Sequence, residues 1–167
     1  MLPFRTILVA TDFSSESVQA FATARAIAVG TASRVVLMHV LPDEPPTPWE
    51  IPPYVDFGLS VVPAAEYLGK LRAEVSRRLE TLAAEHFAGT AGCEVRVGVG
   101  DPARELVRAS EGIGADLIVL ATHGWAGWRK LVFGSVAERV LREAACPVLV
   151  VKCAARGVES PTPPPPA

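Results

Sequence analysis

The chain is short of cysteine, of net charge and of long hydrophobic runs. Its three cysteines in 167 residues lie far apart, without a CxxC pair or an adjacent histidine, which argues against a zinc site and a disulfide framework and indicates a reducing cytoplasm. The formal net charge of −2 gives no general attraction to nucleic acid or to an anionic membrane. No apolar run approaches the roughly 18 residues of a transmembrane span, and the N-terminal run ends at Asp12 without a cleavage site typical of signal peptides.

Apolar runs typical of strands alternate along the chain with the apolar periodicity of helices. Continuous or alternating apolar runs predict five strands, at residues 6–10, 35–41, 93–99, 117–121 and 148–151. Helices are expected between them: from caps at Asp12, Ser14 or Ser15 to about Val29, over residues 64–87, from Asp101 onward and from Gly134 onward. The expected apolar face of the first helix consists of Val18, Phe21, Ala22, Ala24 and Ala28. Gly30 is expected to end the first helix, and Gly112 and Gly114 the third.

Two segments fall outside this pattern. Residues 42–63 are rich in proline and predict a long irregular connection, of a kind that is usually functional, mobile or packed on a partner. Residues 153–167 end in PTPPPPA and lack apolar periodicity, which predicts a disordered or extended tail. We therefore expect one domain over residues 1–152, followed by a proline-rich tail.

Five strands separated by helices predict an α/β protein with a doubly wound, five-stranded parallel sheet and helices on both faces. Ligands of such sheets bind beyond the carboxyl ends of the strands, where the strand order reverses. If the first and fourth strands are neighbours there, Asp12 and the loop at Gly124 face the same crevice.

The stretch from residue 117 to residue 152 favours a phosphate ligand. An apolar strand is followed by a glycine-containing loop, which runs into Gly134 and Ser135 at the start of a helix. Backbone amides at such a helix N-terminus, with the positive end of its dipole, favour an anion, and the Ser135 hydroxyl can donate to it.

Each of these residues also has a purely structural interpretation. Ser135 followed by Glu138 fits a capping box, and Asp12 could cap the first helix without touching a ligand. Gly124 and Gly134 could serve turn geometry alone. His39 and His123 are interpreted as structural histidines at or within buried strands.

The ordered set of segments resembles the universal stress protein family. The chain opens with ILVATDFSSES, continues with VVLMHVL and GDPARELVRASEGIGADLIVLATHG, and closes with GSVAERVLREAACPVLVVK. The resemblance covers nearly all of residues 3–152. It implies strand order 3-2-1-4-5 in a Rossmann-like fold similar to that of the adenine nucleotide alpha hydrolases.

The ATP-binding branch of that family carries Gly, two residues, Gly, nine residues, then Gly and Ser or Thr. Gly124, nine further residues, Gly134 and Ser135 satisfy the second part, whereas the first glycine falls on Ala121, whose methyl group adds bulk near a ribose or phosphate. The resemblance implies adenine near Asp12 and Val40, ribose near Leu120 and Ala121, and phosphates at the helix start. The implied cofactor-binding residues are Ala10, Thr11, Asp12, Val40, Leu120, Ala121, Gly124, Gly127, Gly134, Ser135 and Val136.

Three functions compete on this reading. The first is a stress protein that binds ATP, ADP or AMP as a signal or structural ligand, with or without Mg²⁺. The second is a stress protein that binds no nucleotide and acts through dimerisation. The third is an ATPase or phosphotransferase, which needs a base, metal ligands and charge stabilisation around the γ-phosphate. Because Asp12 is a lone carboxylate in the motifs, no catalytic residue is assigned and at most slow hydrolysis is expected.

The motifs of other doubly wound families do not fit this sequence. A response-regulator receiver domain needs an acidic pair after the first strand, an ATP pyrophosphatase carries Ser-Gly-Gly there, and a Walker A lysine is absent.

Universal stress proteins commonly form homodimers, often through the last strand, here Pro147–Lys152. A bare apolar edge strand would invite aggregation, which also favours a homodimer. No nucleic-acid or membrane partner is expected.

Overall fold

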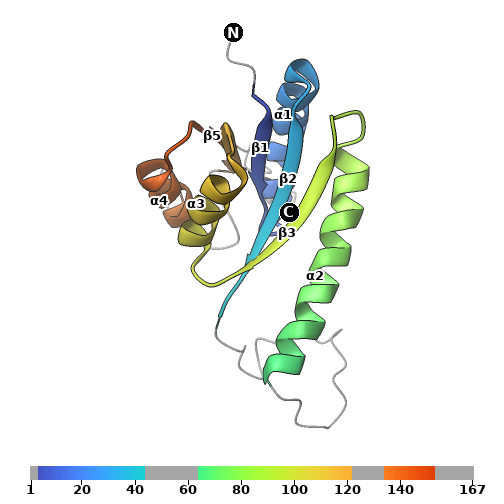
Figure 1. Ribbon diagram of the computed structural model, residues 1–167, viewed down its shortest axis with the longest axis vertical. Helices are drawn as coiled ribbons and strands as arrows, with labels where there is room; N and C mark the ends of the chain where they lie inside the picture. The colour runs from blue at the N-terminus through green and yellow to red at the C-terminus, as the bar shows by residue number, and fades with distance from the viewer. Residues whose placement is uncertain (1–3, 44–63, 122–133, 153–167) are drawn as a thin grey trace, which may run out of the picture.

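The computed structural model describes residues 4–43, 64–121 and 134–152 (Figure 1). Strands and helices alternate from one end of these residues to the other. In chain order they are β1 (Thr6–Ala10), α1 (Ser15–Thr31), β2 (Arg34–Leu41), α2 (Ala64–His86), β3 (Cys93–Val99), α3 (Pro102–Ile113), β4 (Leu117–Ala121), α4 (Ser135–Glu143) and β5 (Val148–Val151).

The five strands form one parallel sheet in the order β3-β2-β1-β4-β5, which confirms the predicted fold class. In the register between β1 and β2, Ala10 pairs with Met38, and in that between β1 and β4, Val9 pairs with Val119. The chain places β2 and β3 on one side of β1, and then β4 and β5 on the other side of β1. The strand order therefore reverses between β1 and β4, where a ligand crevice is expected.

Successive strand residues supply two separate cores, one on each face of the sheet. Ile7 and Val9 pack with Phe21 of α1 and Leu79 of α2, whereas Leu8 packs with residues of α3 and α4. Figure 1 shows the same division, with α3 and α4 together on one side of the strands. Burial on both faces explains why the strand sequences are continuous apolar runs.

The strand bounds agree closely with the sequence pattern, but four helix predictions were wrong. Gly30 and Gly112 lie inside α1 and α3, while the left-handed residues that end these helices are Ala32 and Gly114. Ala22 is exposed, because Ser17 and Ala20 share the buried face of α1 instead. The capping box at the start of α4 does not form, as described below.

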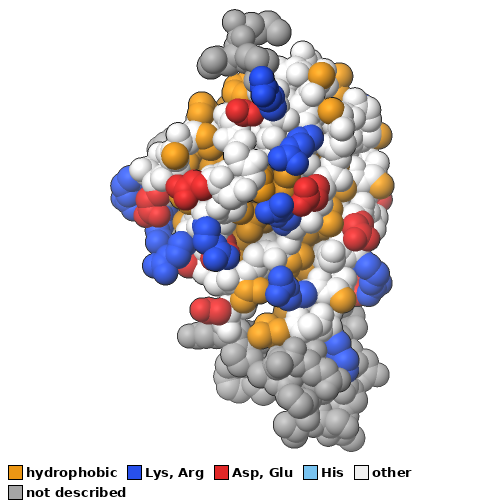
Figure 2. Space-filling model, in the orientation of Figure 1, with side chains coloured by type: hydrophobic (Ala, Val, Ile, Leu, Met, Phe, Trp, Pro, Cys, Tyr) orange, Lys and Arg blue, Asp and Glu red, His pale blue; other side chains and the backbone are white. Residues whose placement is uncertain are grey.

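Charges of both signs lie on the face of the molecule drawn in Figure 2. On the face drawn in Figure 2, basic and acidic side chains are interspersed among hydrophobic ones. Among the described residues, no helix is long and apolar enough to cross a bilayer. The expected tail and most of the connection over residues 42–63 lie outside the described residues.

Candidate functional site

The turn between β1 and α1 is held by its own side chains. The Thr11 hydroxyl accepts from the Phe13 amide at 3.0 Å and shares a 2.8 Å hydrogen bond with the Ser17 hydroxyl. Asp12 accepts from both the amide and the hydroxyl of Ser14. Ser14, in turn, caps α1 by accepting from the Ser17 amide at 3.1 Å. Asp12 is exposed. It orients Ser14, but it does not itself cap the helix.

Neighbouring β2 supports this turn from the side. The Thr11 amide donates to the Met38 carbonyl at 2.9 Å, which extends the ladder beyond the end of β1. His39 Nδ1 lies 2.8 Å from the Thr11 carbonyl, so this nitrogen carries the proton and donates it. Burial of the His39 ring lowers its pKa, partly offset by that hydrogen bond. The structural interpretation of His39 is confirmed, and Val40, the next residue, is half-buried.

The ends of β1 and β4 lie side by side, as the sequence predicted. Continuing the register from Val9 and Val119 by two residues brings Thr11 level with Ala121. Leu120 is buried in the core, and Ala121 is half-buried at the last position of β4. The methyl group that replaces the family's glycine therefore sits at the predicted crevice.

The start of α4 lacks a side-chain cap. Its N-cap residue is Gly134, which has no side chain to make the capping hydrogen bond. Ser135 is the first helical residue rather than the cap, so it cannot form a capping box with Glu138, and its side chain is exposed. The first helical hydrogen bond is donated by the Glu138 amide to the Gly134 carbonyl. The amides of Ser135 and Val136 precede that bond and have no partner within the helix.

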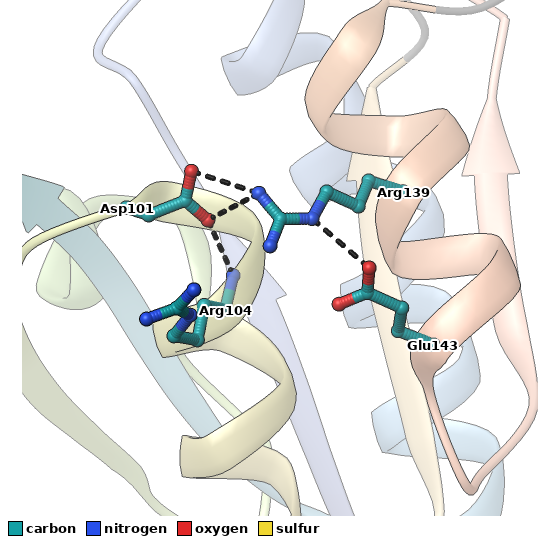
Figure 3. Close-up of polar contacts among 4 residues, drawn as sticks. All are labelled: Asp101, Arg104, Arg139 and Glu143. Atoms are coloured by element: carbon teal, nitrogen blue, oxygen red, sulfur yellow. Dashed lines mark hydrogen bonds and ion pairs between the residues drawn. The ribbon is translucent and has the colours of Figure 1, made fainter.

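A charged cluster ties α4 to α3 (Figure 3). The Arg139 guanidinium contacts both carboxylate oxygens of Asp101 at 3.0 Å, and its Nε donates to Glu143 at 3.0 Å. Asp101 also caps α3 by accepting from the Arg104 amide at 2.9 Å. This amide and the nearby Arg139 lower the pKa of the Asp101 carboxyl. The cluster joins the first turn of α3 to the middle of α4, so it restrains the helix whose N-terminus borders the crevice.

The structure brings most of the predicted site residues to one edge of the sheet. The ends of β1 and β4 meet there, and α4 starts at the same edge because a crossover helix begins at the carboxyl end of the strand before it. Gly124 and Gly127, like His123 and the tryptophans at 125 and 128, lie outside the described residues. Sequence reasoning missed Phe13, which adopts a left-handed backbone conformation in the turn. Its position after Asp12 is visible in the sequence, but nothing there signals a positive φ at phenylalanine.

Comparisons with known proteins agree with this fold. A model of the universal stress protein family matches residues 3–152. The chain belongs to this family. Universal stress protein MJ0577 of Methanocaldococcus jannaschii is 30% identical over 161 residues, which cover 89% of this chain and 95% of that protein. A universal stress protein of Thermus aquaticus, from the QAH/OAS sulfhydrylase 3′ region, is 34% identical over 151 residues. The match covers 89% of this chain and 99% of that protein.

Solved structures of universal stress proteins share the architecture. That of MJ0577 superposes with a TM-score of 0.74 at 28% identity, covering 92% of this chain and 99% of the other. A universal stress protein in complex with cAMP superposes with a TM-score of 0.64 at 24% identity, covering 90% of this chain and 98% of the other. The second likeness concerns the fold alone.

Proposed function

We propose that this universal stress protein binds an adenine nucleotide, with ATP as the preferred ligand, at the carboxyl ends of β1 and β4. The observation that carries the proposal is the start of α4. This helix follows β4 at the switch point of the sheet, and its N-cap residue, Gly134, has no side chain that could cap the first turn. Free amides and a helix dipole at that place suit a phosphate group.

The phosphates would contact the first turn of α4. The amides of Ser135 and Val136 are donors without a helical partner, and the exposed Ser135 hydroxyl adds a third. Failure of the capping box strengthens this proposal, because the structural role that would have occupied Ser135 is not realised. Gly134 places no side chain between the amides and a ligand. Gly124 and Gly127 would extend the phosphate-binding surface from the preceding loop.

The base and ribose would lie over the ends of the strands. Asp12 presents an exposed carboxylate in a turn that several hydrogen bonds hold in place, and a carboxylate accepts hydrogen bonds from an amino or hydroxyl group. Ala10, Thr11 and Val40 would line one side, and Leu120 and Ala121 the other. The cAMP complex supports this only as an example of the fold with an adenine nucleotide.

We propose that the nucleotide acts as a signal or structural ligand rather than as a rapidly consumed substrate. Phosphoryl transfer needs a positioned base, metal ligands and positive charge at the γ-phosphate. Asp12 is engaged by Ser14, and Asp101 is engaged by Arg139. Mg²⁺ would therefore bind mainly through the phosphates, and hydrolysis would be slow at most.

A cytoplasmic location is also part of the proposal. Cys93 and Cys146 are free thiols, and burial raises the pKa of the Cys93 thiol to about 11. Such a thiol is a poor nucleophile, which supports a packing role for Cys93 in a reducing compartment. Cell fractionation would test the location.

The first experiment is mass spectrometry of small molecules released from the purified protein, followed by calorimetric titration with ATP. We expect co-purified ATP or ADP, or saturable binding. Ser135→Ala removes one hydrogen bond to a charged phosphate and should raise the Kd for ATP about tenfold, with no change for adenosine. Ser15→Ala is the matched control, because Ser15 is also an exposed first residue of a helix, but Ser14 caps that helix.

A different result would favour the second function. An empty protein that does not respond to millimolar ATP and Mg²⁺ would mean that Ala121 closes the site. Equal loss of ATP affinity in Ser135→Ala and Ser15→Ala would argue that the start of α4 is not the phosphate site.

We also propose a homodimer through β5, which is an edge strand of the described sheet. All four of its residues are half-buried and apolar. The Pro147 carbonyl accepts from the Ile118 amide of β4, so the backbone groups of Val148 and Val150 face away from β4. A second copy of the chain can pair with these groups and cover the strand.

A further inference from the structure

Phe13 has a backbone conformation that its side chain disfavours. Its φ is 64°, in the left-handed region, where a β-carbon crowds the following carbonyl. Among the described residues, Ala32 is the only other non-glycine residue with a positive φ, and it ends a helix, where such a conformation is common. Phe13 ends no helix. A bulky residue keeps this conformation only when its surroundings impose it, and such positions cluster at functional sites.

Contacts on both the backbone and the ring impose it. The Phe13 amide donates to Thr11, while Asp12 and Ser14 close the rest of the turn. The ring lies 4.6 Å from the His39 ring, centroid to centroid. On α2, which is distant in sequence, Arg78 places its guanidinium 4.3 Å from the centroid of the Phe13 ring. This distance is within the range of an attractive cation–π contact.

We propose that Phe13 and Arg78 are positioning residues of the nucleotide site. Arg78 holds the Phe13 ring, the ring keeps the turn in its left-handed conformation, and the turn presents Asp12 to the ligand. Neither side chain needs to touch the nucleotide. The inference rests on the proposed function and extends it, because it makes α2 a support of a site otherwise built from β1, β4 and α4.

The chain offers a matched control beside Arg78. Arg77 is the preceding residue of the same helix and is also exposed, but it pairs with Glu74 within α2. Arg77→Met and Arg78→Met remove the same charge and keep a similar side-chain stem, whereas only the second removes the contact with Phe13. We expect the Kd for ATP to rise about two- to fivefold in Arg78→Met and to stay within error of the wild type in Arg77→Met.

Two substitutions at Phe13 separate backbone conformation from ring contact. Both Phe13→Ala and Phe13→Gly lose the ring, but glycine adopts a positive φ without strain. If the residue acts by positioning the turn, Phe13→Gly should bind ATP about tenfold more tightly than Phe13→Ala. Arg78→Met should then have no effect in the Phe13→Gly chain, because Arg78 acts through the ring.

Calorimetry on the full-length chain, below the unfolding midpoint of every variant, gives these affinities. If the wild type binds ATP but Arg78→Met and Arg77→Met behave alike, the inference is wrong and the proposed function stands. An equal effect of Arg78→Met in the Phe13 and Phe13→Gly chains would also overturn it, since Arg78 would then act by another route. If the wild type binds no nucleotide, the proposed function fails and the inference fails with it.

Discussion

At the scale of single residues, three aspartates organise the junctions between elements by accepting from backbone amides. Asp12 accepts from Ser14 in the turn after β1, and Asp101 accepts from Arg104 at the start of α3. Asp116, just before β4, accepts from the amides of Arg5 and Thr6 at 2.7 and 2.9 Å and so fixes the start of β1. The two amides, together with the Arg5 charge, lower the pKa of the Asp116 carboxyl.

The lowered pKa of Asp116 predicts the sign of a pH effect. A carboxyl whose folded-state pKa is depressed contributes stability that is complete above its ordinary pKa, about 4, and is lost as the pH falls through that value toward the folded one. Asp116→Asn should therefore cost about 1 kcal/mol at pH 7, a modest figure because the site is partly exposed. The variant should also lose less stability than the wild type between pH 5 and pH 3, as urea unfolding would measure. Equal pH dependence in both proteins would contradict the assignment; Glu80→Gln, exposed on α2, is the control.

At the scale of elements, helix ends depend on backbone conformation rather than on the presence of glycine. Gly112 lies within α3, and a β-carbon added there would meet no atom within 4 Å. Gly114, two residues later, ends the helix at a φ of 60°. The same residue type thus weakens the helix at one position and terminates it at the other.

Two alanine substitutions in α3 should have opposite effects. Gly112→Ala removes unfolded-state freedom at a helical position and should raise the free energy of unfolding by about 0.5–1 kcal/mol. Gly114→Ala forces a β-carbon into the left-handed region and should lower it by about 1–2 kcal/mol. Urea unfolding of both variants measures the difference. Destabilisation by Gly112→Ala, or no loss in Gly114→Ala, would contradict this description of the helix end.

At the scale of the whole molecule, the position of β5 at the edge of the described sheet is the feature that favours assembly. Val150 directs its amide away from β4, so Val150→Pro removes an outward donor without breaking the ladder of the sheet. We expect Val150→Pro to be monomeric in size-exclusion chromatography with light scattering, and a charged residue at 150 to give monomers or insoluble protein. Val150→Thr keeps the amide and should remain dimeric. A monomeric wild type, or a soluble dimer in Val150→Pro, would contradict pairing through β5.

The sequence alone determined the fold. The runs of β1, β4 and β5 are apolar at successive positions because parallel strands are buried on both faces, so their bounds could be predicted to the residue. The meeting of Asp12 with the end of β4 followed from the strand order that the family resemblance implied. Assignments to Gly124, Gly127, the long connection and the tail lie outside the described residues and stay predictions.

Tertiary structure decided the details of the site. The pattern of Ser135 and Glu138 could not reveal that Gly134, rather than Ser135, is the N-cap residue of α4, because a cap depends on where the chain enters the helical conformation. Nor could the sequence reveal the left-handed turn at Phe13, whose ring contacts Arg78 and His39, side chains that only folding brings together. Apolar periodicity is local and can be read along the chain, whereas the conformation of a strained turn depends on contacts between distant segments.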